Sequence, residues 1–164
     1  MLILGGARSG KSRHALELAK KMPAPYVFVA TAEAHDAEMK ERICRHRSER
    51  GSEWRTIEAP IALADAIDQA PTATVLIDCC TIWLSNIMLA GRDTDGDMKR
   101  LIAAIRGSAN PIVMVSNEVG YGIVPDTPLG RRFRDVHGRM NQRLAEISET
   151  VELVVAGIPL RIKG

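Results

Sequence analysis

Aromatic side chains are scarce in this chain, because tryptophan, tyrosine and phenylalanine together make up only 4 % of its 164 residues. Proteins that bind single-stranded nucleic acid stack its bases on exposed aromatic rings, so we expect no nucleic-acid partner. A large net charge is also lacking, since the formal value at pH 7 is +2. Such a charge is too small to attract a polyanion or an anionic membrane through its overall field. We therefore expect an anionic ligand to be small and to be bound locally.

Cysteine is rare as well, with Cys44, Cys79 and Cys80 as its three occurrences. The number is odd and no Cys-x-x-Cys pair occurs, so the sequence indicates neither a disulfide framework nor a zinc site. We interpret the adjacent Cys79 and Cys80 as small residues at the end of a buried strand.

Long apolar segments are absent. The first residues, MLIL, lead directly into glycines and charged residues, without the pattern of a secretory leader. No apolar run reaches the roughly 18 residues of a membrane-spanning helix. We therefore expect no membrane span and a cytoplasmic location.

Short, nearly continuous apolar runs do occur, and they alternate with helical patterns. Continuous apolar character is typical of parallel strands that are covered on both faces. The alternation predicts an α/β fold, with three layers and a mainly parallel sheet, in a single domain over residues 1–164. The expected strands are 1–4, 26–30, 74–78, 111–116 and 151–156, with shorter marginal strands at 54–58 and 160–163. The expected helices are 12–22, 36–50, 61–69, 82–90, 98–106 and 128–150, with a polar turn or loop at 92–97.

The octet GGARSGKS follows the first apolar run and satisfies the P-loop pattern G-x-x-x-x-G-K-[ST]. Its glycines let the backbone wrap a phosphate closely, and amide N–H groups at the start of the next helix point inward. Lys11, which we expect to face solvent, can reach the terminal phosphates, and the Ser12 hydroxyl can bind Mg²⁺. The alternative is a glycine-rich turn that merely enters a helix. We predict a nucleoside triphosphate site formed by Gly5, Gly6, Ala7, Arg8, Ser9, Gly10, Lys11 and Ser12.

Two acidic residues follow other expected strands. Asp78 ends the run VLID, where a P-loop enzyme places an acid that holds Mg²⁺ directly or through water. The alternative is that Asp78 caps the following helix. Glu118 lies just after the strand 111–116, where it could orient an acceptor or act as a base. The alternative for Glu118 is a turn residue beside the glycines at 120 and 122.

A histidine lies on the charged helix expected at 36–50. Met39, Ile43 and His46 share one face of that helix, and arginines surround His46. A neutral imidazole is a competent nucleophile toward phosphorus, and clustered arginines would favour its neutral form while binding phosphate oxygens. A core or surface histidine on a solvated helix face remains the alternative.

Several further segments share a pattern with one known family. They are ATxxxxDxEM at 30–39, RIxxHRxxR at 42–50, WRTIE at 54–58, LIDCxTxWLSN at 76–86, VSNEVGxGIVP at 115–125 and RFRDxxGRxNQRLA at 132–145. With the P-loop, they resemble the bifunctional adenosylcobinamide kinase/adenosylcobinamide-phosphate guanylyltransferase family of cobalamin biosynthesis. The resemblance runs in order from residue 1 to about residue 163.

The resemblance implies two reactions. The first phosphorylates adenosylcobinamide with GTP or ATP. In the second, GMP passes from GTP to a histidine, with release of pyrophosphate, and then to adenosylcobinamide phosphate, giving adenosylcobinamide-GDP. The family's nucleophile corresponds to His46, Mg²⁺ is the metal, held by Ser12 and Asp78, and a homotrimer is the expected assembly. Beyond the P-loop, the implied nucleotide contacts are Thr31, Ala32, Glu33, Arg47, Ser48, Glu49, Arg50, Glu58 and Asp78.

Two other functions compete with this interpretation. A simple P-loop kinase for a small alcohol would leave His46 structural. A GTP-dependent switch would need a guanine-specificity motif such as Asn-Lys-x-Asp, and the sequence contains none. The corrinoid site is not located by these patterns, and we interpret the arginine-rich segment 131–143 as a solvated helix face.

Overall fold

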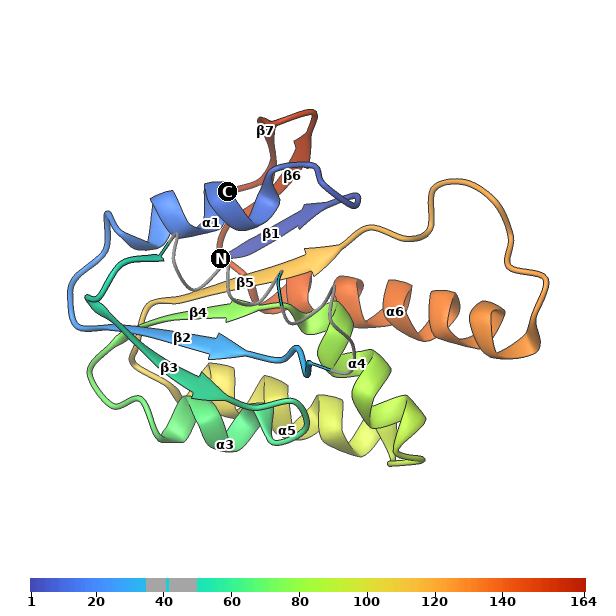
Figure 1. Ribbon diagram of the computed structural model, residues 1–164, viewed down its shortest axis with the longest axis horizontal. Helices are drawn as coiled ribbons and strands as arrows, with labels where there is room; N and C mark the ends of the chain where they lie inside the picture. Colours follow the sequence, from blue (N-terminus) through green and yellow to red (C-terminus); the bar gives the residue numbers. More distant parts are fainter. Residues whose placement is uncertain (35–40, 42–49) are drawn as a thin grey trace.

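The computed structural model describes residues 1–34, 41 and 50–164, and within them seven strands form one sheet (Figure 1). The strand order is β3-β2-β4-β5-β1-β6-β7. All neighbouring strands are parallel except the last pair, in which β7 runs antiparallel to β6. This confirms the expected α/β fold with a mainly parallel sheet. The strands are β1 (Leu2–Gly5), β2 (Tyr26–Ala30), β3 (Trp54–Glu58), β4 (Thr74–Asp78), β5 (Ile112–Asn117), β6 (Val151–Val155) and β7 (Ile158–Lys163).

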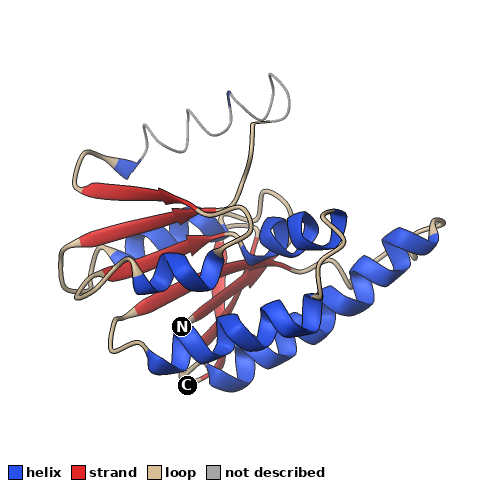
Figure 2. Ribbon diagram, turned by 90° about the horizontal axis from the view of Figure 1, so that it is seen from below, coloured by secondary structure: helices blue, strands red, loops and turns tan. Residues whose placement is uncertain are grey.

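Helices cover both faces of the sheet, so the described part of the chain has three layers (Figures 1 and 2). The helix α1 (Lys11–Ala19) lies on one face, and the other helices lie on the opposite face. These are α3 (Leu63–Asp68), α4 (Cys80–Leu89), α5 (Thr94–Gly107) and α6 (Pro128–Ile147). Most of the helix expected at 36–50 lies outside the described residues.

Alternating side chains of the strands divide the core into two clusters, because successive residues of a strand point to opposite faces. Ile3, Phe28 and Leu76 pack with Ala15 and Ala19 of α1. Their neighbours along each strand pack instead against the larger helical layer. Continuous apolar runs are therefore required in β1, β2 and β4, since both faces are covered.

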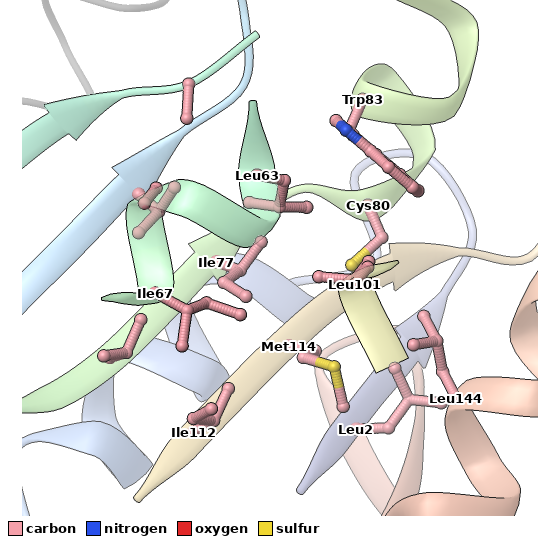
Figure 3. Close-up of a cluster of buried hydrophobic side chains, with 14 of the residues drawn as sticks. Leu2, Leu63, Ile67, Ile77, Cys80, Trp83, Leu101, Ile112, Met114 and Leu144 are labelled. Carbon is pink, nitrogen blue, oxygen red and sulfur yellow. The ribbon is translucent and has the colours of Figure 1, made fainter. Parts of the chain in front are cut away.

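The larger cluster contains most of the largest fully buried side chains (Figure 3). Ile77 of β4 and Met114 of β5 pack there with Leu101 of α5 and Leu144 of α6. Trp83 of α4 is also buried, and its indole N–H donates to the carbonyl oxygen of Ile61 at 2.8 Å. Complete burial of such a side chain contributes about 1.5–3 kcal/mol each. The helical layer therefore anchors the loops that leave the strands.

Residues 94–97 form the first turn of a helix, so the expected loop at 92–97 is wrong except at residues 92 and 93, which precede the helix. The carboxylate of Asp93 accepts a hydrogen bond from the Asp95 amide and caps α5, which begins at Thr94. Asp95 and Asp97 lie in the first turn, where negative charge is favourable at a helix N-terminus. The acidic residues that suggested a loop are therefore start signals of the helix.

The two adjacent cysteines start a helix instead of ending a strand. Strand β4 ends at Asp78, Cys79 is the N-cap of α4, and Cys80 is the first residue of that helix. Both side chains are buried, as expected of small apolar residues.

None of the helices in the described ranges is long and apolar enough to span a membrane.

Candidate nucleotide-binding site

The parallel register brings the carboxyl ends of the six parallel strands, β1 to β6, to one edge of the sheet. Ala30 pairs with Glu58 on one side and with Asp78 on the other, so these residues form a row across β3, β2 and β4. Gly5 at the end of β1 pairs with Asn117 at the end of β5. This edge, at the right of Figure 1, is where open α/β sheets bind their ligands.

The P-loop octet turns back sharply between β1 and α1. Arg8 and Gly10 have φ angles of 54° and 92°, in the left-handed region, and Gly10 is the N-cap of α1. A Cβ atom on Gly5 would lie 2.5 Å from the Ser9 hydroxyl and 2.7 Å from the carbonyl oxygen of Val154. Glycine at this position is therefore required by the close approach of the loop to its neighbours.

The cradle that results fits a phosphate group. The first amides of α1 have no carbonyl partner within the helix, and they carry partial positive charge. The buried Ser9 hydroxyl has no hydrogen-bond partner among the described residues. The octet has Gly5, Ser9 and Lys11 buried, Gly6, Gly10 and Ser12 half-buried, and Ala7 and Arg8 exposed.

Lys11 does not face solvent as the sequence suggested. Its side chain is only 7 % exposed, and its ammonium donates to the carbonyl oxygen of Gly6 at 3.2 Å. The ammonium lies under the loop because α1 starts at this residue and packs directly on the sheet. A buried cation of this kind is favoured by an anion in the cradle.

Asp78 and Lys11 both act electrostatically on Cys79, at the junction of β4 and α4. Burial, with the negative charge of Asp78, raises the pKa of the Cys79 thiol to about 11, whereas the charge of Lys11 lowers it. Both charges therefore act on one thiol, which stays neutral near pH 7. Because Cys79 and not Asp78 is the N-cap residue of α4, and makes no capping hydrogen bond with its side chain, the alternative that Asp78 is the cap is wrong.

The Ser12 hydroxyl and the Asp78 carboxylate are two oxygen ligands. They suit a hard cation that takes most of its ligands from outside the protein. Mg²⁺ binds proteins through one or two oxygen ligands, together with substrate phosphates and water. No group of three or more His, Cys, Asp and Glu residues that could hold a metal ion occurs in the described part of the chain. The two oxygen donors therefore fit Mg²⁺ bound jointly with a triphosphate better than a closed protein site.

The residues after β2 differ in their access to a ligand. The Thr31 side chain is buried, and its hydroxyl donates to the carbonyl oxygen of Cys79 at 2.8 Å while accepting from the Cys79 amide at 2.9 Å. Ala32 is half-buried, and Glu33 is exposed. Glu58, at the end of β3, is also exposed. Thr31 thus ties the end of β2 to the start of α4.

Arg50 is the part of the arginine-rich segment that the structure describes. Its guanidinium carbon lies 3.6 Å from the ring centre of Phe28, and both side chains are buried. This cation–π contact places Arg50 on the α1 face of the sheet. His46, Arg47, Ser48 and Glu49 lie outside the described residues.

The segment after β5 contains Glu118, whose carboxylate accepts from the Gly120 amide at 2.7 Å. This hydrogen bond lies within a turn, as in the alternative that the sequence left open for Glu118.

The arginines of α6 are mostly engaged at its surface: Arg131 donates to the carbonyl oxygens of Pro125 and Asp126, and Arg143 pairs with Asp95.

Two backbone hydrogen bonds that the sequence patterns did not indicate hold the P-loop from either side. The Glu118 amide donates to the Gly5 carbonyl at 2.9 Å, and the Gly157 amide donates to the Ser9 carbonyl at 2.8 Å. Gly157 lies in the tight turn between β6 and β7, where it has a φ of 81°. The glycine in that turn was the only feature of the sequence that could have indicated this contact.

A buried histidine was also missed. His137 of α6 is fully buried, and its Nε2 lies 3.0 Å from the Thr81 hydroxyl. Its Nδ1 has no hydrogen-bond partner among the described residues. Burial lowers the pKa of His137 to about 4, against the opposing effect of the Glu118 charge. The imidazole is therefore neutral near pH 7.

Comparisons with known proteins agree on one family. The family model described as "CobU: Cobinamide kinase / cobinamide phosphate guanyltransferase" matches residues 1–162. The "Bifunctional adenosylcobalamin biosynthesis protein CobP" of Pseudomonas aeruginosa is 43 % identical over 167 residues, which cover 99 % of this chain and 96 % of the relative. The corresponding CobU protein of Salmonella typhimurium is 41 % identical over 180 residues, covering 99 % of each chain.

Solved structures of low sequence identity share the fold. A protein of Pyrococcus horikoshii studied as PH0250 has a TM-score of 0.57 at 10 % identity, covering 99 % of this chain and 85 % of its own. A type III secretion ATPase of pathogenic bacteria has a TM-score of 0.54 at 12 % identity, covering 93 % of this chain. The match spans about half, 49 %, of that ATPase chain. These likenesses support the P-loop type of α/β fold.

The tight approach at Gly5 predicts that Gly5→Ala destabilises the protein even without nucleotide. The added methyl group collides with a backbone carbonyl that β6 holds in place, so we expect a loss of about 1–3 kcal/mol in the free energy of unfolding. Gly6→Ala is the matched control, since a Cβ atom there meets nothing within 4 Å. Urea unfolding of the two variants measures the difference, and equal losses would contradict the described geometry.

The buried His137 predicts a pH-dependent stability. In the unfolded chain His137 has a pKa of 6.5 and is protonated below that pH. In the folded chain it is protonated only below about pH 4. The free energy of unfolding therefore falls as pH falls through this window, by on the order of 3 kcal/mol in total. His137→Gln retains an N–H donor without titrating, so its stability should fall less between pH 6.5 and 4. Identical slopes in urea unfolding of both proteins would refute this assignment.

Proposed function

This chain belongs to the cobinamide kinase / cobinamide phosphate guanyltransferase family, and we propose that both reactions use one triphosphate site at the carboxyl edge of its sheet. It is an enzyme of adenosylcobalamin biosynthesis, like the bifunctional relatives that it matches along nearly their whole length. The observation that carries the site assignment is the folded octet between Gly5 and Ser12. Its buried Lys11, together with a Ser9 hydroxyl that has no partner within residues 1–34 and 50–164, forms a cradle that suits phosphate oxygens.

In the kinase reaction, the P-loop amides and Lys11 bind the β- and γ-phosphates of GTP or ATP. The aminopropanol hydroxyl of adenosylcobinamide attacks the γ-phosphorus and loses its proton, and the nucleoside diphosphate leaves. Catalysis of such a transfer depends mainly on positioning and on stabilisation of charge. The dipole of α1 and the ammonium of Lys11 offset the negative charge that develops on the leaving phosphate.

In the guanylyl transfer, a ring nitrogen of His46 attacks the α-phosphorus of GTP and pyrophosphate leaves. The terminal phosphate of adenosylcobinamide phosphate then attacks the same phosphorus, and the phosphorus–nitrogen bond breaks. A covalent step of this type replaces one displacement by two easier ones. His46 lies outside the described residues, and the family resemblance supports its role.

The described histidines support this choice by their contacts. His14 Nε2 is paired with the Glu152 carboxylate at 2.6 Å, where Arg161 also binds. His137 is buried away from solvent in the helical layer. These contacts engage the Nε2 of His14 and bury His137, which supports the assignment of the nucleophile to His46 that the family resemblance implies.

Mg²⁺ would be held by the Ser12 hydroxyl and by Asp78, directly or through water, and would neutralise phosphate charge when bound. The other proposed nucleotide contacts have distinct roles. Thr31 acts through its bonds to Cys79, whereas Ala32 is half-buried and Glu33 and Glu58 are exposed at the same edge. Arg50, with Arg47, Ser48 and Glu49, completes the set proposed to contact the nucleotide.

The proposed setting follows from the family. We infer one catalytic domain over residues 1–164, a homotrimeric assembly and a cytoplasmic location, where GTP and corrinoid intermediates are available. A simple kinase without the guanylyl step remains the competing function. The two are separated by whether the protein itself becomes labelled with GMP.

Asp78→Asn is predicted to weaken the use of Mg²⁺, because the variant keeps its size but loses its charge. We expect the concentration of Mg²⁺ that gives half-maximal kinase activity to rise about 10- to 100-fold, with partial rescue at high Mg²⁺. Asp68→Asn, an exposed aspartate at the end of α3, is the matched control. A normal Mg²⁺ requirement in Asp78→Asn would remove Asp78 from the metal site.

The experiment that tests the function is incubation with α-labelled GTP and Mg²⁺. A phosphorus–nitrogen bond to imidazole is labile in acid and comparatively stable in base, so the protein should keep its label at high pH and lose it at low pH. We expect His46→Ala and His46→Asn to acquire no label, while their kinase activity persists. His14→Asn is the control and should label normally.

Two outcomes would count against the proposal. If the parent protein never carries label while it phosphorylates adenosylcobinamide, the simple kinase is correct. If His46→Ala still gains base-stable label, another residue is the nucleophile.

A further inference from the structure

Strand β5 extends farther than its neighbour β4 toward the carboxyl edge of the sheet, where the proposed nucleotide site lies. The pairing of these strands ends at Asp78 and Val115, whereas β5 continues through Ser116 to Asn117. Beyond Val115, the backbone of β5 therefore has no strand partner on the side of β4. A peptide group in that position needs other hydrogen bonds, because leaving it unpaired and half-buried is costly.

Side chains from two helices replace the missing strand. The Asn117 amide donates to the Thr81 hydroxyl of α4 at 2.7 Å. The Asn117 carbonyl accepts from the side-chain amide of Asn141 of α6 at 3.0 Å. Ser116 completes the arrangement by donating its hydroxyl hydrogen to the Asn141 side-chain oxygen at 2.7 Å. The backbone N–H of Asn117 is thus held by Thr81, and its backbone carbonyl is held by Asn141.

His137 closes this buried network. Its Nε2 lies 3.0 Å from the Thr81 hydroxyl and 3.5 Å from that of Ser116. Placing the imidazole proton on Nε2 lets it donate to Thr81 and leaves Nδ1 as the unpaired acceptor, which costs less than a buried unpaired N–H. The Thr81 hydroxyl can then donate to Ser116, 3.3 Å away. Every hydroxyl hydrogen of the network has a defined acceptor.

The peptide held by this network leads directly to the P-loop. The residue after Asn117 is Glu118, whose amide donates to the carbonyl oxygen of Gly5 at 2.9 Å. Gly5 is the first residue of the octet, and its close contacts leave it little freedom to move. Any rotation of the peptide after Asn117 therefore displaces the start of the phosphate cradle.

We propose that Thr81 and Asn141, supported by His137, are positioning residues for the nucleotide, acting through Asn117 and Glu118 on the P-loop. The inference rests on the proposed triphosphate site, and it adds three residues that touch no substrate. Its distinctive consequence is a loss of nucleotide affinity that exceeds the loss expected from destabilisation alone. In the parent protein the network already holds the cradle in one conformation. A variant that lacks part of the network must order the cradle when the nucleotide binds, and this cost lowers its affinity for the nucleotide.

The test compares Thr81→Val with Thr74→Val. Thr74 is also buried, and its hydroxyl donates to the carbonyl oxygen of Pro23 at 2.6 Å, but it lies at the opposite end of the sheet, at the start of β4. Each variant keeps the side-chain shape and loses one buried hydroxyl. The dissociation constant for GTP is measured by titration calorimetry with Mg²⁺ and without corrinoid, alongside the thermal midpoint.

We expect both variants to lose thermal stability, but only Thr81→Val to bind GTP more weakly. The expected change is about tenfold in the dissociation constant, which corresponds to about 1.4 kcal/mol. Thr81→Ser keeps the hydroxyl and should restore GTP affinity even where its lost methyl group lowers the midpoint. Equal GTP affinity in Thr81→Val and Thr74→Val would overturn the proposal.

A second pair covers the case in which Thr81→Val does not fold. Asn141→Ala removes the amide that binds the Asn117 carbonyl, and Asn110→Ala removes a similar amide that donates to the Ala70 carbonyl at 2.6 Å, just before β5. The same affinity difference is expected between them, and its absence would refute the positioning role. A parent protein that binds no GTP would instead overturn the proposed triphosphate site itself, and the inference with it.

Discussion

Strand β1 is hydrogen-bonded along both edges and covered on both faces, and the nucleotide site depends on this arrangement. It pairs with β5 on one side and with β6 on the other, while Leu2, Ile3 and Leu4 are almost completely buried. A strand held in this way cannot shift its register without exposing apolar side chains. The loop that follows it therefore starts from a fixed point, and the sharp turn into α1 is fixed at both ends.

The same arrangement explains why a cation is buried where stability alone would not place one. Burying an ammonium costs free energy unless hydrogen bonds and opposite charge compensate it. The Lys11 ammonium donates to the Gly6 carbonyl, and the charges of Lys11 and Asp78 both act on the Cys79 thiol. The phosphate that we propose as ligand would bring further negative charge to this ammonium. A site of this kind gives up some stability of the empty protein for affinity toward an anion.

Local sequence signals were sufficient for most strands and for the P-loop, but not for the contacts that hold the loop. The bounds of β2, β3 and β4 were predicted correctly, because β2 and β4 are short β-type runs between helical patterns and WRTIE of β3 is a short segment rich in strand-forming residues. The start of α5 was missed because Asp93 acts through a cap, which resembles a polar turn in sequence. The bonds from Gly157 and Glu118 join segments far apart in the chain, and they depend on strand register. Periodicity carries no information on such contacts.

The two reactions that we propose for this site place different demands on one cradle. Phosphorylation needs attack at the γ-phosphorus, whereas guanylyl transfer needs attack at the α-phosphorus of the same nucleotide. A P-loop held at Gly5 by Glu118 and at Ser9 by Gly157 offers one phosphate position, since neither end is free to move alone. The choice between the reactions must then come from the groups that approach the bound triphosphate. An acceptor hydroxyl at the γ end gives the kinase, and a nucleophile reaching the α-phosphorus from outside the P-loop gives the transferase, so a rigid cradle is compatible with both activities.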